Sequence, residues 1–195
     1  MRKKETPLLI LLIVGTLLFD FTGFSLMTLL AILIHEVGHL LAARCMKIPW
    51  RGFSVALTGA RLEVSGRMIS YFEEWLLCAA GPLTGLIFAA LGACFWETTQ
   101  YAVWFSCASL LLSLFNLLPV RGFDGGRMLE CALLSLFKVK NALRVSKLLS
   151  FFSLFLVWAT ANYFLLRAGS GLSLFCFSTV LFLRFLEDCE DGVDL

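Results

Sequence analysis

The sequence predicts an all-α polytopic membrane protein, with about six transmembrane helices and a small membrane-associated β-hairpin between the second and third. Three observations predict this class. Hydrophobic residues make up 59% of the 195 residues and charged residues only 15%, whereas a soluble domain carries about 25% charged residues. The apolar residues gather in six runs. If these runs alternate in direction, nearly all Lys and Arg residues fall on one side of the membrane.

The six expected helices cover residues 7–19, 24–43, 75–95, 101–118, 148–166 and 172–186. A helix needs about 20 residues to cross the hydrocarbon core, so the first run is short for a span. All of the 16 Lys and Arg residues except Arg167 then lie on the same side. The positive-inside rule places that side, and both chain termini, in the cytoplasm.

Residues 1–195 are expected to form a single domain, because no internal repeat and no hydrophilic regulatory domain is evident in the sequence. The seven Cys residues form no C-x-x-C pair, which argues against a disulfide framework or a cysteine zinc site. The net charge of +2 is too small to indicate a nucleic-acid partner. The composition makes the lipid bilayer an expected partner. The sequence assigns no oligomeric state.

The segment 49–70 has the pattern of a short β-hairpin. Apolar residues alternate with small or polar ones over 53–58 and again over 60–64, with a plausible turn around Gly59. The alternative is an amphipathic surface loop. An open hairpin edge can pair with an extended peptide.

The run 24–43 contains the only two histidines of the chain, and Glu36 is the only Asp, Glu, Lys or Arg within it. Placing an ionisable side chain in the hydrocarbon core costs several kcal/mol unless the side chain is neutralised or coordinates a metal. His35 and His39 are four residues apart and share one helix face. This H-E-x-x-H pattern is typical of two zinc ligands with a glutamate as general base. The alternative is two hydrogen-bonded helix histidines with an incidental glutamate.

A catalytic zinc site needs three protein ligands and one open position. The candidates for the third ligand on the same side are Glu63, Glu73, Glu74, Asp124 and Glu130. We favour Asp124, because Pro119 and the glycines of 122–126 break the helix beside it and let a short side chain turn back into the bundle. The aspartate can instead be an N-cap. A zinc protease of another type would use Glu130 or Glu73.

Asn116 lies in the fourth apolar run, two turns before the proposed third ligand. Its amide can hold a substrate backbone or a developing oxyanion, or can make a helix–helix hydrogen bond. The small residues of 78–85 predict close helix packing. The segment 127–147 mixes apolar and basic residues and is expected to be an interfacial amphipathic helix.

These motifs, namely HEVGH at 35–39, AGPL at 80–83, NLLP at 116–119 and DGG at 124–126, resemble those of the site-2 protease family of intramembrane zinc metalloproteases. The order of the motifs is also that of the family. The chain looks most like its bacterial sporulation branch, which processes pro-sigma-K.

The resemblance implies one Zn²⁺ per chain bound by His35, His39 and Asp124, with Glu36 as catalytic base. It also implies that Asn116 and the hairpin, with Gly59 as a candidate, contact substrate.

Two departures from the family are visible. Gly85 stands where many relatives carry asparagine, and no cytoplasmic regulatory domain follows the last expected helix.

The function expected from these residues is zinc-dependent cleavage of a transmembrane or membrane-anchored protein near the cytoplasmic face. The expected enzyme is a zinc metalloendopeptidase that carries out regulated intramembrane proteolysis. Its expected location is the cell membrane, as a multi-pass protein. The alternative is a non-proteolytic zinc-binding membrane chaperone or transporter. Transporters often show repeat symmetry, and no repeat is evident here.

Overall fold

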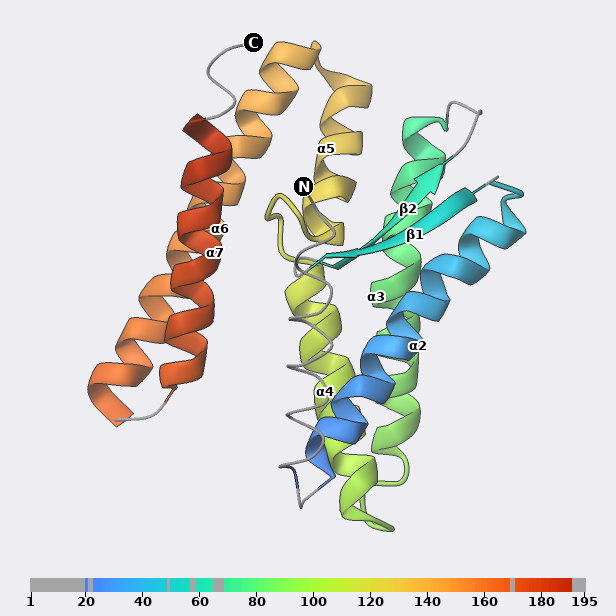
Figure 1. The fold of residues 1–195 in the computed structure, drawn as a ribbon, viewed down its shortest axis with the longest axis vertical. Coiled ribbons are helices and arrows are strands. Elements are labelled where there is room, and N and C mark those ends of the chain that lie inside the picture. The colour runs from blue at the N-terminus through green and yellow to red at the C-terminus, as the bar shows by residue number, and fades with distance from the viewer. Residues whose placement is uncertain are drawn as a thin grey trace.

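A computed structural model describes residues 20, 23–48, 50–56, 59–64, 69–168 and 171–190 (Figure 1). Its helices are α2 (Phe24–Cys45), α3 (Tyr71–Ala93), α4 (Gln100–Asn116), α5 (Asp124–Leu136), α6 (Val139–Ala168) and α7 (Leu172–Glu190). The strands are β1 (Trp50–Ala56) and β2 (Gly59–Val64). The expected first helix, 7–19, lies outside the described residues.

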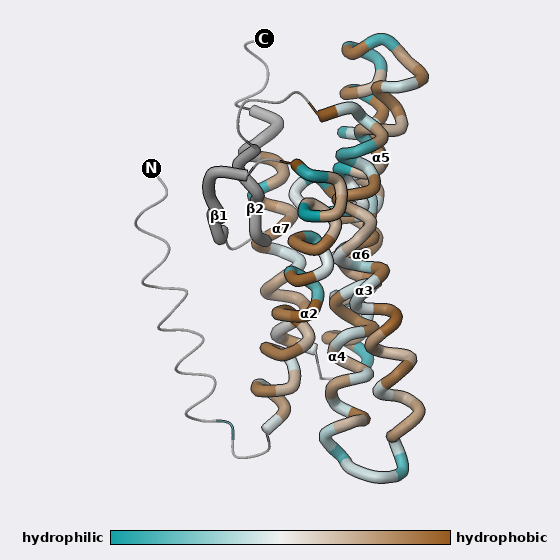
Figure 2. Tube along the Cα trace, turned by 90° about the vertical axis from the view of Figure 1, so that its right-hand side faces the viewer, coloured by the Kyte–Doolittle hydropathy of each residue, from teal (hydrophilic) through white to brown (hydrophobic). Residues whose placement is uncertain are grey.

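Three of the described helices are long and apolar enough to cross a membrane: α2, α3 and Val139–Arg167 of α6. The helix α4 has 17 residues, which gives a length of about 26 Å at 1.5 Å per residue, slightly short of a typical hydrocarbon core. In α7 the apolar part is Leu174–Leu186. Hydrophobic residues run along the helices, and hydrophilic ones gather mainly at their ends (Figure 2). The protein is therefore a membrane protein, and the count of six spans stays a prediction.

The helices form two groups that lie apart in Figure 1. In the first, α2, α3 and α4 pack on one another and α5 packs on α3. In the second, α6 packs on α7 and is joined to the first group through α5. The first group is close-packed because glycines face neighbouring helices: a Cβ on Gly38 would lie 2.8 Å from the Ala80 carbonyl oxygen.

The segment 49–70 contains the two strands, which pair antiparallel with Ala56 opposite Gly59. A shift in register, as at a β-bulge, interrupts the ladder between Trp50 and Gly52. The described part of this sheet has two strands. Each strand therefore has one edge that its partner does not cover.

The helical path is interrupted between α4 and α5, over residues 117–123. This segment, called the break below, positions the start of α5. Gly122 has φ +103°, a value that favours glycine. A Cβ on Gly125 would lie 2.1 Å from the Leu117 carbonyl oxygen, and one on Gly126 would lie 2.1 Å from that of Val120. The two glycines therefore let the first turn of α5 rest directly on the backbone of the break.

The helix expected over 127–147 is divided in the structure. The helix α5 ends at Leu136, Phe137 is extended with φ −125° and ψ 160°, and α6 begins at Val139. The basic part of the expected interfacial helix thus forms the first turns of α6. A single extended residue between two helices leaves no mark in the local pattern of apolar and basic residues. The prediction of one continuous helix over 127–147 was therefore wrong at Phe137.

Candidate metal centre

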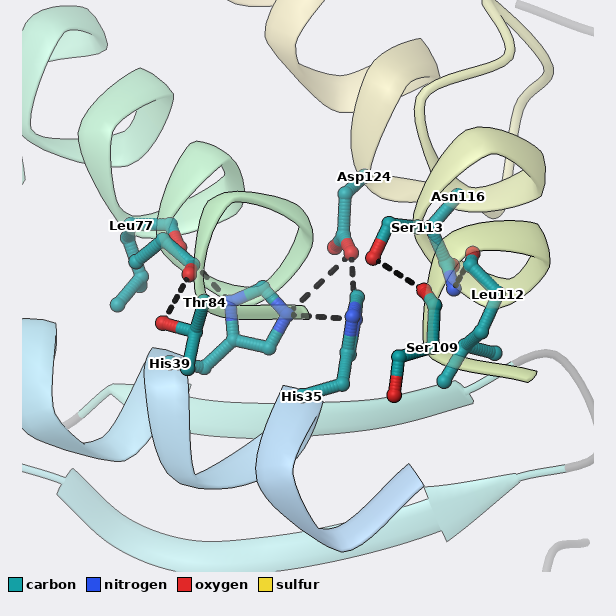
Figure 3. A network of polar contacts seen from close by, with 10 residues as sticks. His35, His39, Leu77, Thr84, Ser109, Leu112, Ser113, Asn116 and Asp124 are labelled. Atoms are coloured by element: carbon teal, nitrogen blue, oxygen red, sulfur yellow. Dashed lines mark hydrogen bonds and ion pairs between the residues drawn. The ribbon is translucent and has the colours of Figure 1, made fainter. Parts of the chain in front are cut away.

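Two helices bring the predicted ligands together. His35 and His39 point from one face of α2 toward Asp124, the first residue of α5 (Figure 3). The Asp124 Oδ2 atom lies 3.1 Å from His35 Nε2 and 3.3 Å from His39 Nε2. The two Nε2 atoms are 3.3 Å apart. Among the described residues, these three form a group that can hold a metal ion.

The triangle of donor atoms fits a tetrahedral metal ion. Ligand atoms bound to zinc at 2.0–2.1 Å in tetrahedral geometry are separated by roughly 3.3 Å, which is the spacing seen here. His39 Nδ1 donates a hydrogen bond to the Leu77 carbonyl oxygen at 2.8 Å. In a neutral imidazole this leaves a lone pair on Nε2, directed at the other two ligand atoms. The carboxylate oxygen of Asp124 and the two Nε2 atoms would repel one another at this distance unless a cation or a proton lay between them.

Both histidines are held by their surroundings. His35 is 3% exposed, and its Nδ1 atom has no hydrogen-bond partner in the described part of the chain. His39 lies against α3, where a Cβ on Gly81 would come within 2.2 Å of its Nε2 atom. Only glycine leaves room for the imidazole at this point. The A-G-P-L motif, interpreted from the sequence as packing alone, therefore makes space for a candidate ligand.

Asp124 occupies the first helical position, and Phe123 takes the N-cap position considered for it. A negative charge is stabilised at a helix N-terminus. Burial alone would raise the pKa of the Asp124 carboxyl, but the neighbouring His35 and His39 imidazoles outweigh burial and lower this pKa. The carboxylate is thus ionised at neutral pH, as a ligand must be.

The alternative third ligands that the structure describes make other contacts. Glu73 completes a capping box with Ser70 at the start of α3. Glu130 lies 3.3 Å from Arg121 in an ion pair, and Glu74 pairs with Arg127. The side chain of Glu63 lies outside the described residues. This distribution favours Asp124 over the other described carboxylates.

No contact tests the roles predicted for the remaining residues, Glu36, Asn116 and Gly59. Glu36 lies between the two histidines in sequence, is half-buried and is close enough to His39 to interact electrostatically. The Asn116 amide nitrogen donates to the Leu112 carbonyl oxygen of its own helix at 3.0 Å (Figure 3). Gly59 opens β2.

The departure at Gly85 has a structural counterpart. A Cβ on Gly85 would lie 2.2 Å from the hydroxyl oxygen of Ser113. The Ser113 hydroxyl, fully buried on α4, thus occupies the space that a side chain at position 85 would need. It donates to the Ser109 carbonyl oxygen at 2.8 Å. The polar atom at this place comes from α4 and not from α3.

Sequence reasoning missed two contributors to the site. The Leu77 carbonyl oxygen is a backbone atom, which no side-chain pattern marks. Ser150 of α6 bonds the backbone of the break before Asp124, and a single serine within an apolar helix gives no distinctive signal. The sequence shows Gly81 of the A-G-P-L motif, but it gives no sign that this glycine lies against the His39 imidazole.

Comparison with known proteins finds three similarities. Residues 92–160 match the family model "Peptidase family M50". The chain is 29% identical over 121 residues to "Putative zinc metalloprotease Rip3" from two strains of Mycobacterium tuberculosis. That alignment covers 57% of this chain and 31% of the relative. The chain therefore spans about a third of the length of the curated relatives it matches.

A solved structure has the same fold. The "Site-2 Protease from Methanocaldococcus jannaschii" superposes with a TM-score of 0.62 at 18% identity, covering 92% of this chain and 85% of that one. At this identity the likeness establishes the fold. The matched family model, the relatives and the solved structure are all described as peptidases or proteases.

Proposed function

We propose that this chain is a member of Peptidase family M50 that acts as a zinc-dependent intramembrane endopeptidase. The observation that carries the proposal is the triangle formed by His35, His39 and Asp124, whose donor atoms lie 3.1–3.3 Å apart. Its edges match those of a tetrahedral zinc site. The family match over 92–160 adds support. The narrower sporulation branch stays a prediction.

His35, His39 and Asp124 would hold one Zn²⁺ ion per chain. When bound, zinc supplies Lewis-acid chemistry, activating a water molecule and polarising the carbonyl of the scissile peptide bond. The Glu36 carboxylate accepts a proton from the attacking water and passes it to the leaving amine nitrogen. The Leu77 carbonyl oxygen keeps the proton of His39 on Nδ1, so that Nε2 stays available for the metal.

The proposed substrate is a transmembrane or membrane-anchored protein, cut near the cytoplasmic face. A helix conceals its peptide bonds, and an exposed strand edge can hold an unwound segment by β-augmentation. The pair β1–β2, with Gly59 at the start of β2, is the proposed binding edge. Asn116 is proposed as an auxiliary contact to the substrate backbone.

The proposed topology is a multi-pass protein of the cell membrane with both termini in the cytoplasm. It is supported by the distribution of Lys and Arg, all but one of which lie on one side of the six expected helices. Arg121 lies within the break before Asp124, and Arg127 follows in the first turn of α5. The active-site opening is accordingly proposed to face the cytoplasmic half of the bilayer.

The experiment is zinc analysis combined with a cleavage assay on a single-span membrane substrate, using protein reconstituted in lipid. Glu36→Gln should keep one zinc per chain and lose cleavage by at least about 100-fold, the usual range for a general base. Asp124→Ala should lose cleavage and bind zinc much more weakly, through His35 and His39 alone. Glu130→Gln, the matched control carboxylate on α5, should keep both.

Cleavage by Glu36→Gln at the parent rate would overturn the proposed mechanism. Zinc loss in Glu130→Gln, with zinc retained in Asp124→Ala, would overturn the ligand set. A parent protein that binds zinc but cuts no tested substrate, including a shortened membrane-anchored one, would favour a zinc-binding chaperone or transporter.

A further inference from the structure

The break between α4 and α5 is fixed from outside by one side chain of α6. Ser150 is fully buried. Its hydroxyl donates to the Pro119 carbonyl oxygen and accepts from the Arg121 backbone N–H, each at 3.1 Å. One hydroxyl thus satisfies two backbone groups of a segment that has no regular helix or strand.

A second contact from α6 holds the residue between these two. Val120 is 3% exposed and packs in one cluster with Leu154 and Phe185. Ser150 and Leu154 are four residues apart and lie on the same face of α6. The helix therefore holds residues 119–121 by a polar contact and an apolar contact, one turn apart.

The segment that α6 holds is the one on which the first turn of α5 rests. The Val120 carbonyl oxygen accepts a hydrogen bond from the Phe123 N–H at 3.0 Å. A Cβ on Gly126 would lie only 2.1 Å from the same oxygen. Asp124 lies between these two contacts, so the place of its carboxylate depends on the place of Val120.

We propose that Ser150 is a positioning residue for the metal centre. By holding the backbone of 119–121, it sets where Asp124 meets His35 and His39, and it couples the α6–α7 pair to the metal centre. This inference rests on the proposed zinc site, because it concerns the third ligand of that site. Ser150 touches neither the metal ligands nor the reacting atoms and acts only through the break.

The chain offers a matched control one turn away on the same helix. Ser146 is also fully buried, but its hydroxyl has no hydrogen-bond partner within the described ranges. Ser150→Ala and Ser146→Ala therefore remove the same group from the same helix at the same burial. Only the first removes contacts to the break.

The experiment measures zinc affinity by competition with a chelator, in full-length protein reconstituted in lipid. Ser150→Ala should weaken zinc binding about 10-fold. This is the lower end of the range of about 10–100-fold that is typical when a residue supporting a metal ligand is removed. Ser146→Ala should bind zinc as the parent does. Thermal unfolding of the zinc-free proteins reports general destabilisation separately. If Ser150→Ala does not fold, Ser150→Cys, with a weaker donor of similar size, should show a smaller loss.

A double-mutant cycle separates positioning from general structure. In an Asp124→Ala background, Ser150→Ala should cause no further loss of zinc affinity, because the ligand it positions is gone. An equal loss with and without Asp124 would overturn the inference, as would parent-like affinity in both Ser150 variants. If Asp124→Ala itself binds zinc like the parent, the proposed ligand set fails instead.

Discussion

The two helix groups differ in the polar contacts that join their helices. In the α2–α5 group several such contacts link neighbouring elements: His39 bonds the Leu77 carbonyl oxygen of α3, and the Ser106 hydroxyl of α4 bonds that of Ala89 on α3. Between α6 and α7 the described residues show one, from Trp158 to Thr179, and other hydroxyls bond back to their own helix, as Thr160 does to Leu156. Polar contacts between elements specify one arrangement, whereas contacts within a helix leave its neighbours free to shift.

Packing differs in the same way. Glycines in α2–α5 bring backbones and the His39 imidazole into direct contact. Aromatic rings fill much of the α6–α7 interface, where Phe151 and Trp158 of α6 lie 5.7 and 6.3 Å from Phe182 of α7 between ring centroids. Aromatic pairs tolerate a range of offsets. The comparison teaches that the close-packed group carries the candidate metal centre, and that the α6–α7 pair reaches this site through the break before α5.

The strongest test of this contrast is Gly81→Ala. The new methyl group would lie 2.2 Å from His39 Nε2, so the imidazole must move away from the other two ligand atoms. We expect zinc affinity to fall by about 100-fold or more, as for a severe disturbance around a ligand. Chelator competition in reconstituted protein measures it.

Gly85→Ala is the matched control, one turn along the same helix. Its methyl group would meet the Ser113 hydroxyl, which is the end of a side chain and not a candidate ligand. We expect a loss of stability of about 1–3 kcal/mol from overpacking, with zinc affinity close to that of the parent. If both variants lose zinc equally, the special role of position 81 is wrong.

A second test acts on the contact between the break and α5. Gly126→Ala places a Cβ 2.1 Å from the Val120 carbonyl oxygen, and backbone atoms cannot rotate away. We expect the first turn of α5 to shift and zinc affinity to fall about 10-fold, in the range for disturbed metal-site supports. Ala132→Gly, an exposed position on the same helix, tests whether a change in helix propensity alone has this effect. Equal losses would contradict the steric explanation.

Local spacing explains how much of the metal centre the sequence could predict. His35 and His39 are four residues apart in one helix, so their common face follows from helix geometry alone. Asp124 was predicted with more difficulty, through the Pro and Gly residues that mark the break. The Leu77 contact and the Ser150 contact join segments 38 and 29–31 residues apart. Such contacts depend on how helices pack, which no local pattern records.

The fold divides similarly into predictable and unpredictable parts. The predicted run 24–43 corresponds to α2 at Phe24–Cys45, because hydrophobic length alone marks a long apolar helix. The corner at Phe137 was missed, because the mixture of apolar and basic residues continues across it. The strands β1 and β2 lie in the segment whose residues alternate, and the binding role of their edge stays a prediction.

A smaller effect is expected at the ion pair between α3 and α5. Glu74→Gln removes the partner of Arg127, whose side chain is 43% exposed. Because solvent screens such a pair, the expected loss of stability is about 0.5 kcal/mol, with zinc affinity nearly unchanged. Glu130→Gln, which removes the partner of Arg121, should behave alike. A loss of zinc in Glu74→Gln alone would give this pair a part in placing α5.

The smallest effect on the metal centre is expected from the α6–α7 interface. The Trp158 indole N–H donates a hydrogen bond across the α6–α7 interface to the Thr179 hydroxyl at 3.2 Å. Trp158→Phe keeps an aromatic ring and loses that bond, at a cost of about 1 kcal/mol. Since Trp158 lies two turns from Ser150 along α6 and touches no part of the break described above, zinc affinity should match that of the parent. If this variant weakens zinc as much as Ser150→Ala does, the metal centre depends on the whole α6–α7 packing and not on the contact that one hydroxyl makes with residues 119–121.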